Sequence, residues 1–219
     1  MLKLHGFSLS NYSNIVKQCL MEKGIEFEQL DTRPSQEEDF LAVSPMGKIP
    51  CLETEEGFLI ETAVMLDYLD EIYPQAPTFP SQAFEKAKAR EIIQVTEMYV
   101  ELVARRHLGE AFFGRERSES AYTEVRPQME KGLQAFSRLV NFGPYVMGSE
   151  FGIVDIFVYY SFGLARQILK RIYDWDINAE VPGLEAHIAL MNEREITRSV
   201  VADNKKAMTD LMNQMSAAK

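Results

Sequence analysis

The sequence predicts an α/β domain over residues 1–74, a linker over residues 75–81 and an all-helical domain over residues 82–219. Three observations lead to this fold class. Apolar and polar residues alternate in short runs within the first 60 residues, as in half-buried strands, and not convincingly after Gln82. Three prolines fall between Tyr73 and Pro80, which indicates a linker. Beyond the linker, apolar residues recur at helical spacing over long segments.

The α/β part is predicted in the order strand, helix, strand, helix, strand, strand, helix. Alternation predicts the strands, and capping residue types predict the starts of the helices. The last two strands are close enough to form an antiparallel hairpin. The expected strands are residues 2–6, 25–30, 49–53 and 58–60, and the expected helices are residues 13–24, 35–44 and 61–73.

The helical part is predicted as three long helices and two shorter ones. The long helices cover residues 83–113, 119–140 and 153–171. Pro127 is expected to kink the second of them, because proline removes a hydrogen bond from a helix interior. The shorter helices follow Pro182 and lie near Glu195.

Pro50 stands at the head of a short apolar strand, where proline removes a hydrogen-bond donor. A cis Ile49-Pro50 peptide bond resolves this conflict, because it turns the end of the strand outward. The N–H and C=O of Ile49 are then directed away from the rest of the strand. We expect them to pair with a peptide-like ligand.

The distribution of charge argues against one class of function. The net charge is −10, and residues 1–80 hold 5 Lys and Arg against 14 Asp and Glu, a balance of 5 − 14 = −9. Residues 81–219 hold 18 against 19, a balance of −1. The sequence shows no basic stripe that could displace counterions, so nucleic-acid binding is disfavoured.

Hydropathy and cysteine content predict the cellular compartment and the state of the cysteines. No apolar run reaches the roughly 20 residues that span a bilayer. The N-terminus has no signal-peptide pattern, so we expect a cytoplasmic protein without membrane contact. Cys19 and Cys51 are too few for a disulfide framework, and reduced, inert core thiols are expected. No histidine, cysteine and carboxylate spacing indicates a metal.

Two segments carry a family resemblance. The run Ser-Pro-Met-Gly-Lys-Ile-Pro-Cys-Leu at residues 44–52 resembles the Asn-Pro-x-Gly-x-Val-Pro-x-Leu segment of the glutathione S-transferase superfamily, with Ser44 in place of the usual Asn. Glu61-Thr62-Ala63, followed by Tyr-Leu-Asp-Glu-Ile-Tyr-Pro at residues 68–74, is similar to its next helix. Ser10 occupies the serine position of its first loop, and residues 151–156 are similar to its Phe-Ser-x-Ala-Asp-Ile capping segment, with Gly152 in place of the capping hydroxyl. The resemblance implies a thioredoxin-like first domain.

The resemblance also implies how glutathione is bound. The main chain of Ile49, before Pro50, would pair with the cysteinyl unit of glutathione, as in strand addition. Thr62 would hold the γ-glutamyl carboxylate at a helix N-terminus, and Glu61 would accept from the γ-glutamyl ammonium. Lys48 and Arg33 are candidates for the glycine carboxylate.

Ser10 is the main catalytic candidate. Its hydroxyl, at the start of a helix, would donate to the glutathione sulfur and lower the pKa of the thiol. Tyr12 and Asn11 are alternates, because a phenol and an amide also donate. The loop has Ser10 and Ser13 where dithiol enzymes of this fold carry Cys-x-x-Cys, so dithiol exchange is not expected.

The resemblance places a pocket for a small hydrophobic electrophile between the two domains. Its expected residues are Phe7, Tyr12, Val103, Arg106 and His107. Asp155 is expected to cap a helix.

The predicted function is a homodimeric glutathione transferase of detoxification, with glutathione as co-substrate and no metal. Two alternatives remain open. One is a non-catalytic adaptor of the stringent starvation protein A type. The other is a glutathione-dependent isomerase or peroxidase, which would use the same thiolate.

Overall fold

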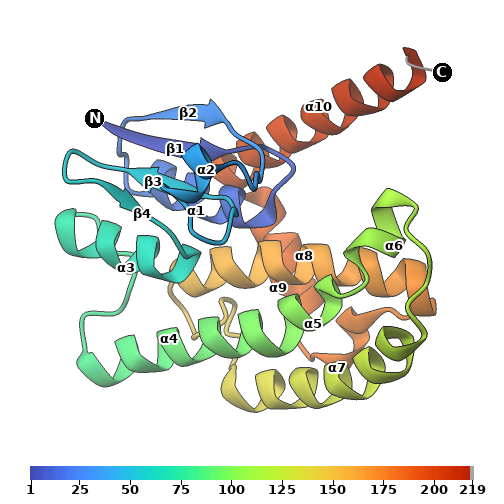
Figure 1. Cartoon of the computed structure of the whole chain (residues 1–219). Coiled ribbons are helices and arrows are strands. Elements are labelled where there is room, and N and C mark those ends of the chain that lie inside the picture. The colour runs from blue at the N-terminus through green and yellow to red at the C-terminus, as the bar shows by residue number, and fades with distance from the viewer. Residues whose placement is uncertain (218–219) are drawn as a thin grey trace. The chain divides into compact units, whose positions relative to one another are not determined.

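The computed structural model describes residues 1–217, and their side chains as far as residue 214. Internal contacts divide the chain into two compact units, whose elements are labelled in Figure 1. The first unit comprises Met1–Thr78 together with the segment from Asn192 onward, and the second is Phe79–Met191. No helix in the described part of the chain is long and apolar enough to cross a membrane.

The first unit is built on a four-stranded mixed sheet in the order β2-β1-β3-β4. The strand β1 is parallel to β2 and antiparallel to β3, and β3 is antiparallel to β4. This is the arrangement of a thioredoxin-like domain, as predicted. The strands are β1 (Leu2–Gly6), β2 (Phe27–Asp31), β3 (Cys51–Glu53) and β4 (Phe58–Leu59), and the helices are α1 (Asn11–Glu22), α2 (Glu38–Leu41), α3 (Thr62–Ile72) and α10 (Glu195–Ala217).

Burial explains why these segments fold as they do. Strand β1 alternates strictly between buried and half-buried residues, as its sequence pattern predicted. Helix α1 packs against β1 and α3, and its apolar residues Ile15, Val16, Cys19 and Leu20 have no exposed surface. The sheet and these two helices therefore share one core.

The C-terminal helix differs from the prediction in length and in grouping. A short helix was expected near Glu195, whereas α10 has 23 residues. It packs on α1, so the segment from Asn192 groups with the first unit instead of with the helical part. The boundary after Thr78 falls inside the predicted linker. Val200 of this helix has no exposed surface.

The second unit is all-helical. Helix α8 lies at its centre and contacts α4, α5, α6 and η1, and twelve of its residues are buried. Asp155 caps this helix as expected, because its carboxylate accepts from the N–H of Gly152 and of Val146, both at 2.8 Å. The elements are α4 (Ala83–Thr96), η1 (Glu97–Glu101), α5 (Leu102–Arg105), α6 (Leu108–Phe113), α7 (Glu119–Leu139), α8 (Ile153–Tyr173), η2 (Ile177–Glu180) and α9 (Leu184–Glu193).

The long helix expected over residues 83–113 is interrupted. Its middle, η1, is a π-helical turn, and the chain bends again before α6. A side-chain carbon at Gly132 of α7 would lie 2.1 Å from the carbonyl oxygen of Tyr99, so the two backbones touch there. Such long-range packing is not visible in helical periodicity. Helix α7 contains Pro127 and does not end at it.

Candidate functional site

Ser10 is the N-cap of α1, in an extended conformation with φ −82° and ψ 120°. Its Oγ accepts from the N–H of Ser13 at 3.2 Å, its N–H donates to the carbonyl of Phe7 at 3.0 Å, and its own carbonyl accepts from the N–H of Asn14 at 3.0 Å. The hydroxyl proton has no acceptor among the described residues. Ser10 is half-buried. It therefore presents an O–H donor at the positive end of a helix.

Gly6 connects this turn to Pro50. A side-chain carbon at Gly6 would lie 2.3 Å from Ser13 Oγ and 3.8 Å from Cβ of Pro50. The end of β1, the first turn of α1 and Pro50 are therefore neighbours. A side chain at position 6 would collide with the Ser13 side chain unless that side chain moved. The Ile49-Pro50 peptide bond is cis, as predicted.

The loop before Pro50 is stabilised by hydrogen bonds between its own residues. Ser44 is 1% exposed, and its Oγ accepts from the N–H of Lys48 at 3.1 Å and donates to the carbonyl of the same residue at 2.8 Å. Gly47 has φ +62°, a conformation that favours glycine. These bonds fix the chain on the N-terminal side of Ile49.

Glu61 and Thr62 begin α3. Glu61 is the N-cap with φ 66° and ψ 117°, which is strained for a residue with a side chain, and its side chain makes no capping bond. Thr62 is 5% exposed and Glu61 is exposed. The first N–H groups of a helix have no partner within it. This end of α3 is therefore an anion-binding geometry that no side-chain cap blocks.

The charged groups near the loop differ in what they contact. The Lys48 ammonium is exposed and has no partner among the described residues. The Arg33 guanidinium carbon lies 4.0 Å from the ring centroid of Phe7, and its Nε lies 3.7 Å from Asp31. Lys48 is thus the freer cation of the two for a carboxylate ligand.

The two thiols are buried. Burial raises the pKa of Cys19 to about 12, and burial also raises the pKa of Cys51. Thiols with such pKa values stay protonated at neutral pH and react slowly. Their environment agrees with the expected role as packing residues.

The residues expected in the electrophile pocket belong to different units. Phe7 and Tyr12 lie in the first unit and are half-buried. In the second unit, Val103 is 9% and His107 is 1% exposed, which leaves these two side chains little surface for a ligand. Arg106 is more exposed and donates to Glu124 at 2.8 Å.

His107 belongs to a buried cluster of the second unit. Its Nδ1 lies 3.1 Å from Glu110 Oε2, and its Nε2 lies 2.8 Å from the hydroxyl of Tyr173. That hydroxyl also donates to the carbonyl of Tyr122 at 2.9 Å. Arg106 and His107 both line a hollow of about 420 Å³, together with residues of α6.

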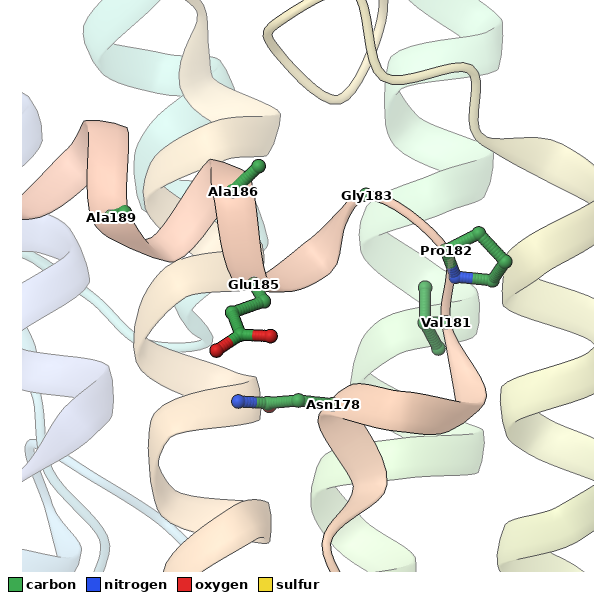
Figure 2. Close-up of a pocket in the computed structure, with 7 residues that line it drawn as sticks. All are labelled: Asn178, Val181, Pro182, Gly183, Glu185, Ala186 and Ala189. Carbon is green, nitrogen blue, oxygen red and sulfur yellow. The ribbon is translucent and has the colours of Figure 1, made fainter.

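A larger hollow of about 540 Å³ lies at the start of α9. Figure 2 shows that its lining comes from η2, from the turn between η2 and this helix, and from the first turns of the helix itself. None of its residues was predicted to be functional. They are Asn178, Val181, Pro182, Gly183, Glu185, Ala186 and Ala189.

The structure adds three residues around Ser10 that sequence reasoning missed. Gly6 is one of them. Asn14 and Asn204 are the others, because both donate to the carbonyl of Ser8, at 2.9 and 2.7 Å. An Asn near the predicted start of α1 was a weak local signal for Asn14. Nothing local indicates Asn204, which is 196 residues away from Ser8.

Comparison with known proteins assigns the chain to a family. The family model described as glutathione S-transferase, N-terminal domain, matches residues 4–77. A glutathione S-transferase of Pseudomonas putida is 38% identical over 219 residues, with 100% of both chains covered. A stringent starvation protein A homolog of Haemophilus influenzae is 26% identical over 149 residues, which are 67% of this chain and 66% of that protein.

Among solved structures, a glutathione S-transferase of Methylobacillus flagellatus with glutathione bound has the same fold. It superposes with a TM-score of 0.74 at 22% identity, and covers 91% of this chain and 98% of its own. The full-length match to the Pseudomonas putida protein is the stronger indication of kinship. The chain belongs to the glutathione S-transferase family.

Proposed function

We propose that this protein is a glutathione transferase, which binds glutathione in its first unit and activates the thiol for attack on a small hydrophobic electrophile. The observation that carries the proposal is the O–H of Ser10. This donor stands at the N-terminus of α1, and the other hydrogen bonds of Ser10 leave its proton unused among the described residues. Gly6 brings the same turn next to Pro50.

Glutathione would be bound by the residues around Pro50 and by the start of α3. The main-chain groups of Ile49 would pair with the cysteinyl unit, since the loop that precedes them is fixed by Ser44. Thr62 and the free N–H groups of α3 suit the γ-glutamyl carboxylate, and Glu61 suits the ammonium. Lys48 is the proposed partner of the glycine carboxylate.

The strained conformation of Glu61 supports this assignment. A non-glycine residue at positive φ costs roughly 1–3 kcal/mol and is concentrated at ligand sites. At Glu61 this conformation carries a carboxylate that makes no capping bond with its own helix. A role in ligand binding would explain why Glu61 keeps this unfavourable backbone conformation.

Thiolate stabilisation would supply the activation. A free thiol has a pKa of roughly 8.5 and is mostly protonated at neutral pH. A hydrogen bond to a charged group contributes about 1.5–3 kcal/mol, and each 1.36 kcal/mol is one pKa unit. The Ser10 hydroxyl would therefore lower the thiol pKa by about 1–2 units. Tyr12 and Asn11 remain the alternates.

For the electrophile pocket we retain Phe7, Tyr12 and Arg106. We withdraw Val103 and His107, because 9% and 1% exposure leaves them too little surface. Transfer of an alkyl or aryl group, isomerisation and peroxide reduction would all start from the same thiolate. Group transfer to glutathione sulfur is the reaction that we propose.

We also propose that the protein is a homodimer. The first unit has exposed apolar side chains on the loop before β3, on β4 and on α3, and surfaces of this kind are typical of subunit contacts. They belong to Met46, Phe58, Val64 and Ile72, which are 60%, 44%, 50% and 41% exposed. Sedimentation of wild type and of a Val64→Glu variant tests the assembly, since a charge at the contact should yield monomers.

Calorimetric titration with glutathione, followed by ultraviolet titration of the bound thiolate against pH, tests the enzymatic function. We expect binding at millimolar ligand or below, and a thiol pKa below that of free glutathione. In Ser10→Ala this pKa should rise by about 1–2 units. No binding at millimolar glutathione would contradict the proposal and favour an adaptor.

Ser13→Ala is the matched control. Ser13 lies in the same turn, its Oγ is buried without a hydrogen-bond partner among the described residues, and its N–H still donates to Ser10 after the substitution. The thiol pKa should not change. If Ser10→Ala also leaves it unchanged, Tyr12→Phe and Asn11→Ala identify the donor.

A further inference from the structure

Helix α10 lies antiparallel along α1 and is joined to it by polar contacts within the first unit. Arg194, just before α10, pairs with Glu22 near the end of α1 at 2.8 Å. Thr197 accepts from Gln18 one turn earlier on α1, at 2.8 Å. Farther along α10, Asp203 pairs with Lys17 at 2.7 Å.

The last contact of this row reaches the loop before α1. Asn204 Nδ2 donates to the carbonyl of Ser8 at 2.7 Å, and Asn14 Nδ2 donates to the same oxygen at 2.9 Å. Ser8 lies two residues before Ser10, in a turn that is closed by the bond from the Ser10 N–H to Phe7. One donor thus comes from α1 and the other from α10.

The two donors use both lone pairs of one carbonyl, and that fixes the plane of the peptide group that follows Ser8. Asn14 is 2% exposed and Asn204 is half-buried. With one donor removed, this peptide group gains freedom to rotate, and the turn that carries the Ser10 hydroxyl rotates with it. A donor must be held to within about 0.5 Å to act on a thiolate.

We propose that Asn204 is a positioning residue for thiol activation: through the Ser8 carbonyl, the C-terminal helix holds the turn that presents the Ser10 hydroxyl. This inference rests on the proposed function. It assigns to α10 a role in the chemistry of the first unit besides its packing on α1.

Asn204→Ala and Asn204→Leu remove the donor, and Leu keeps most of the volume. The matched control is Thr197→Val, which removes a buried contact between α10 and α1 but does not touch Ser8. The measurement is the pH titration of glutathione thiolate absorbance on each full-length variant. Affinity for S-methylglutathione, which has no thiol to ionise, is measured in parallel.

Both Asn204 variants should raise the thiol pKa by about 0.5–1 unit, which is a three- to tenfold loss of thiolate below the pKa. Affinity for S-methylglutathione should change less than about twofold, and Thr197→Val should leave the thiol pKa at the wild-type value. Equal pKa shifts in Thr197→Val and Asn204→Ala would overturn the inference, because general loosening of α10 would then be the cause. A shift below about 0.2 units in both Asn204 variants would overturn it too.

Failure of the proposed function has a different signature. If the unchanged protein binds no glutathione, that function fails and this inference fails with it. If Asn204→Ala raises the thiol pKa while Ser10→Ala does not, Ser10 is not the donor and the positioning role, which acts through the Ser10 hydroxyl, is overturned. If Ser10→Ala raises it while neither Asn204 variant does, only the role of Asn204 is overturned.

Discussion

The Ser44 hydroxyl forms hydrogen bonds with both backbone groups of Lys48: it accepts from the N–H at 3.1 Å and donates to the carbonyl at 2.8 Å. A single buried side chain thereby closes the loop that leads to Ile49. The related segment of the family carries Asn at this position, and an amide can also donate and accept. The side chain at position 44 therefore links the stability of the loop to the proposed glutathione site.

Ser44→Ala removes both bonds, which takes the side-chain partner from the part-buried Lys48 N–H and leaves the Lys48 carbonyl with the weaker Cys51 Sγ contact at 3.5 Å. We expect a loss of about 1–3 kcal/mol in the free energy of unfolding, together with weaker glutathione binding. Chemical denaturation and calorimetric titration measure the two effects. Ser44→Asn should keep most of the affinity.

Thr54→Ala is the control for this loop. The Thr54 hydroxyl makes similar bonds to Glu56 and Gly57 in the turn between β3 and β4, where it is solvated. Its loss should leave glutathione affinity unchanged. Equal losses of affinity in Ser44→Ala and Thr54→Ala would contradict a local role for Ser44.

Substitutions of Glu61 can separate an effect on the stability of the fold from an effect on glutathione binding. Glu61→Gly relieves the strain of φ 66°. The free energy of unfolding of this variant should therefore equal that of wild type or exceed it by up to about 1 kcal/mol. Glutathione affinity should nevertheless fall, because the proposed partner of the γ-glutamyl ammonium is lost. Thermal unfolding and calorimetry give the two numbers.

Glu61→Gln separates charge from conformation. It keeps the side chain and the strained backbone but removes the charge, so it should weaken glutathione binding without gaining stability. A Glu61→Gly variant with unchanged affinity would remove Glu61 from the glutathione site.

Lys23 and Asp70 form a buried ion pair that joins α1 to α3. Their Nζ–Oδ1 distance is 3.1 Å, their side chains are 0% and 6% exposed, and Asp70 also accepts from the N–H of Thr78 at 2.7 Å. Lys23→Met removes this cation from a buried carboxylate, and should cost about 3–5 kcal/mol in the free energy of unfolding. Urea denaturation measures the loss.

An exposed pair provides the comparison. Lys170 and Asp174 are 58% and 88% exposed, so solvent screens this pair and Lys170→Met should cost much less stability than Lys23→Met. Similar costs for Lys23→Met and Lys170→Met would show that burial does not determine the strength of these pairs here.

Local patterns were enough to predict most of the first unit. Alternation around Leu4, the proline at position 50 and the run of residues 44–52 each report on neighbours in the chain. The sheet and the cis Ile49-Pro50 bond follow from such signals, as does the cap at Asp155 in the second unit, and the structure confirms them.

Features set by distant packing could not be predicted. The π-helical turn at residues 97–101 lies where Gly132 meets the carbonyl of Tyr99. Asn204 reaches Ser8 only because α10 packs on α1, and His107 is buried by Tyr173, which lies 66 residues away. Helical periodicity records that a face is buried, and it does not record which helix covers it.

Glu53 links strand pairing to pH. It lies on β3 opposite Lys3 of β1, and its carboxylate accepts from Lys3 Nζ at 2.7 Å and lies 2.8 Å from His5 Nε2. The bond from Lys3, followed by that from His5, holds the pKa of Glu53 below its ordinary value of 4.5. A carboxyl with a lowered pKa in the folded state contributes stability above the unfolded pKa, and this contribution is lost as pH falls through the folded pKa.

Glu53→Gln should therefore be less stable than wild type at about pH 6, and the difference should shrink toward zero as the pH falls to about 3. Urea denaturation at several pH values measures it. Glu55→Gln is the control, because Glu55 is 90% exposed and, within the described part of the chain, forms an ion pair only with the N-terminal ammonium of Met1, at 3.4 Å. Its stability should follow the wild-type curve. If the difference between Glu53→Gln and wild type is the same at every pH, Glu53 contributes through packing and not through its charge.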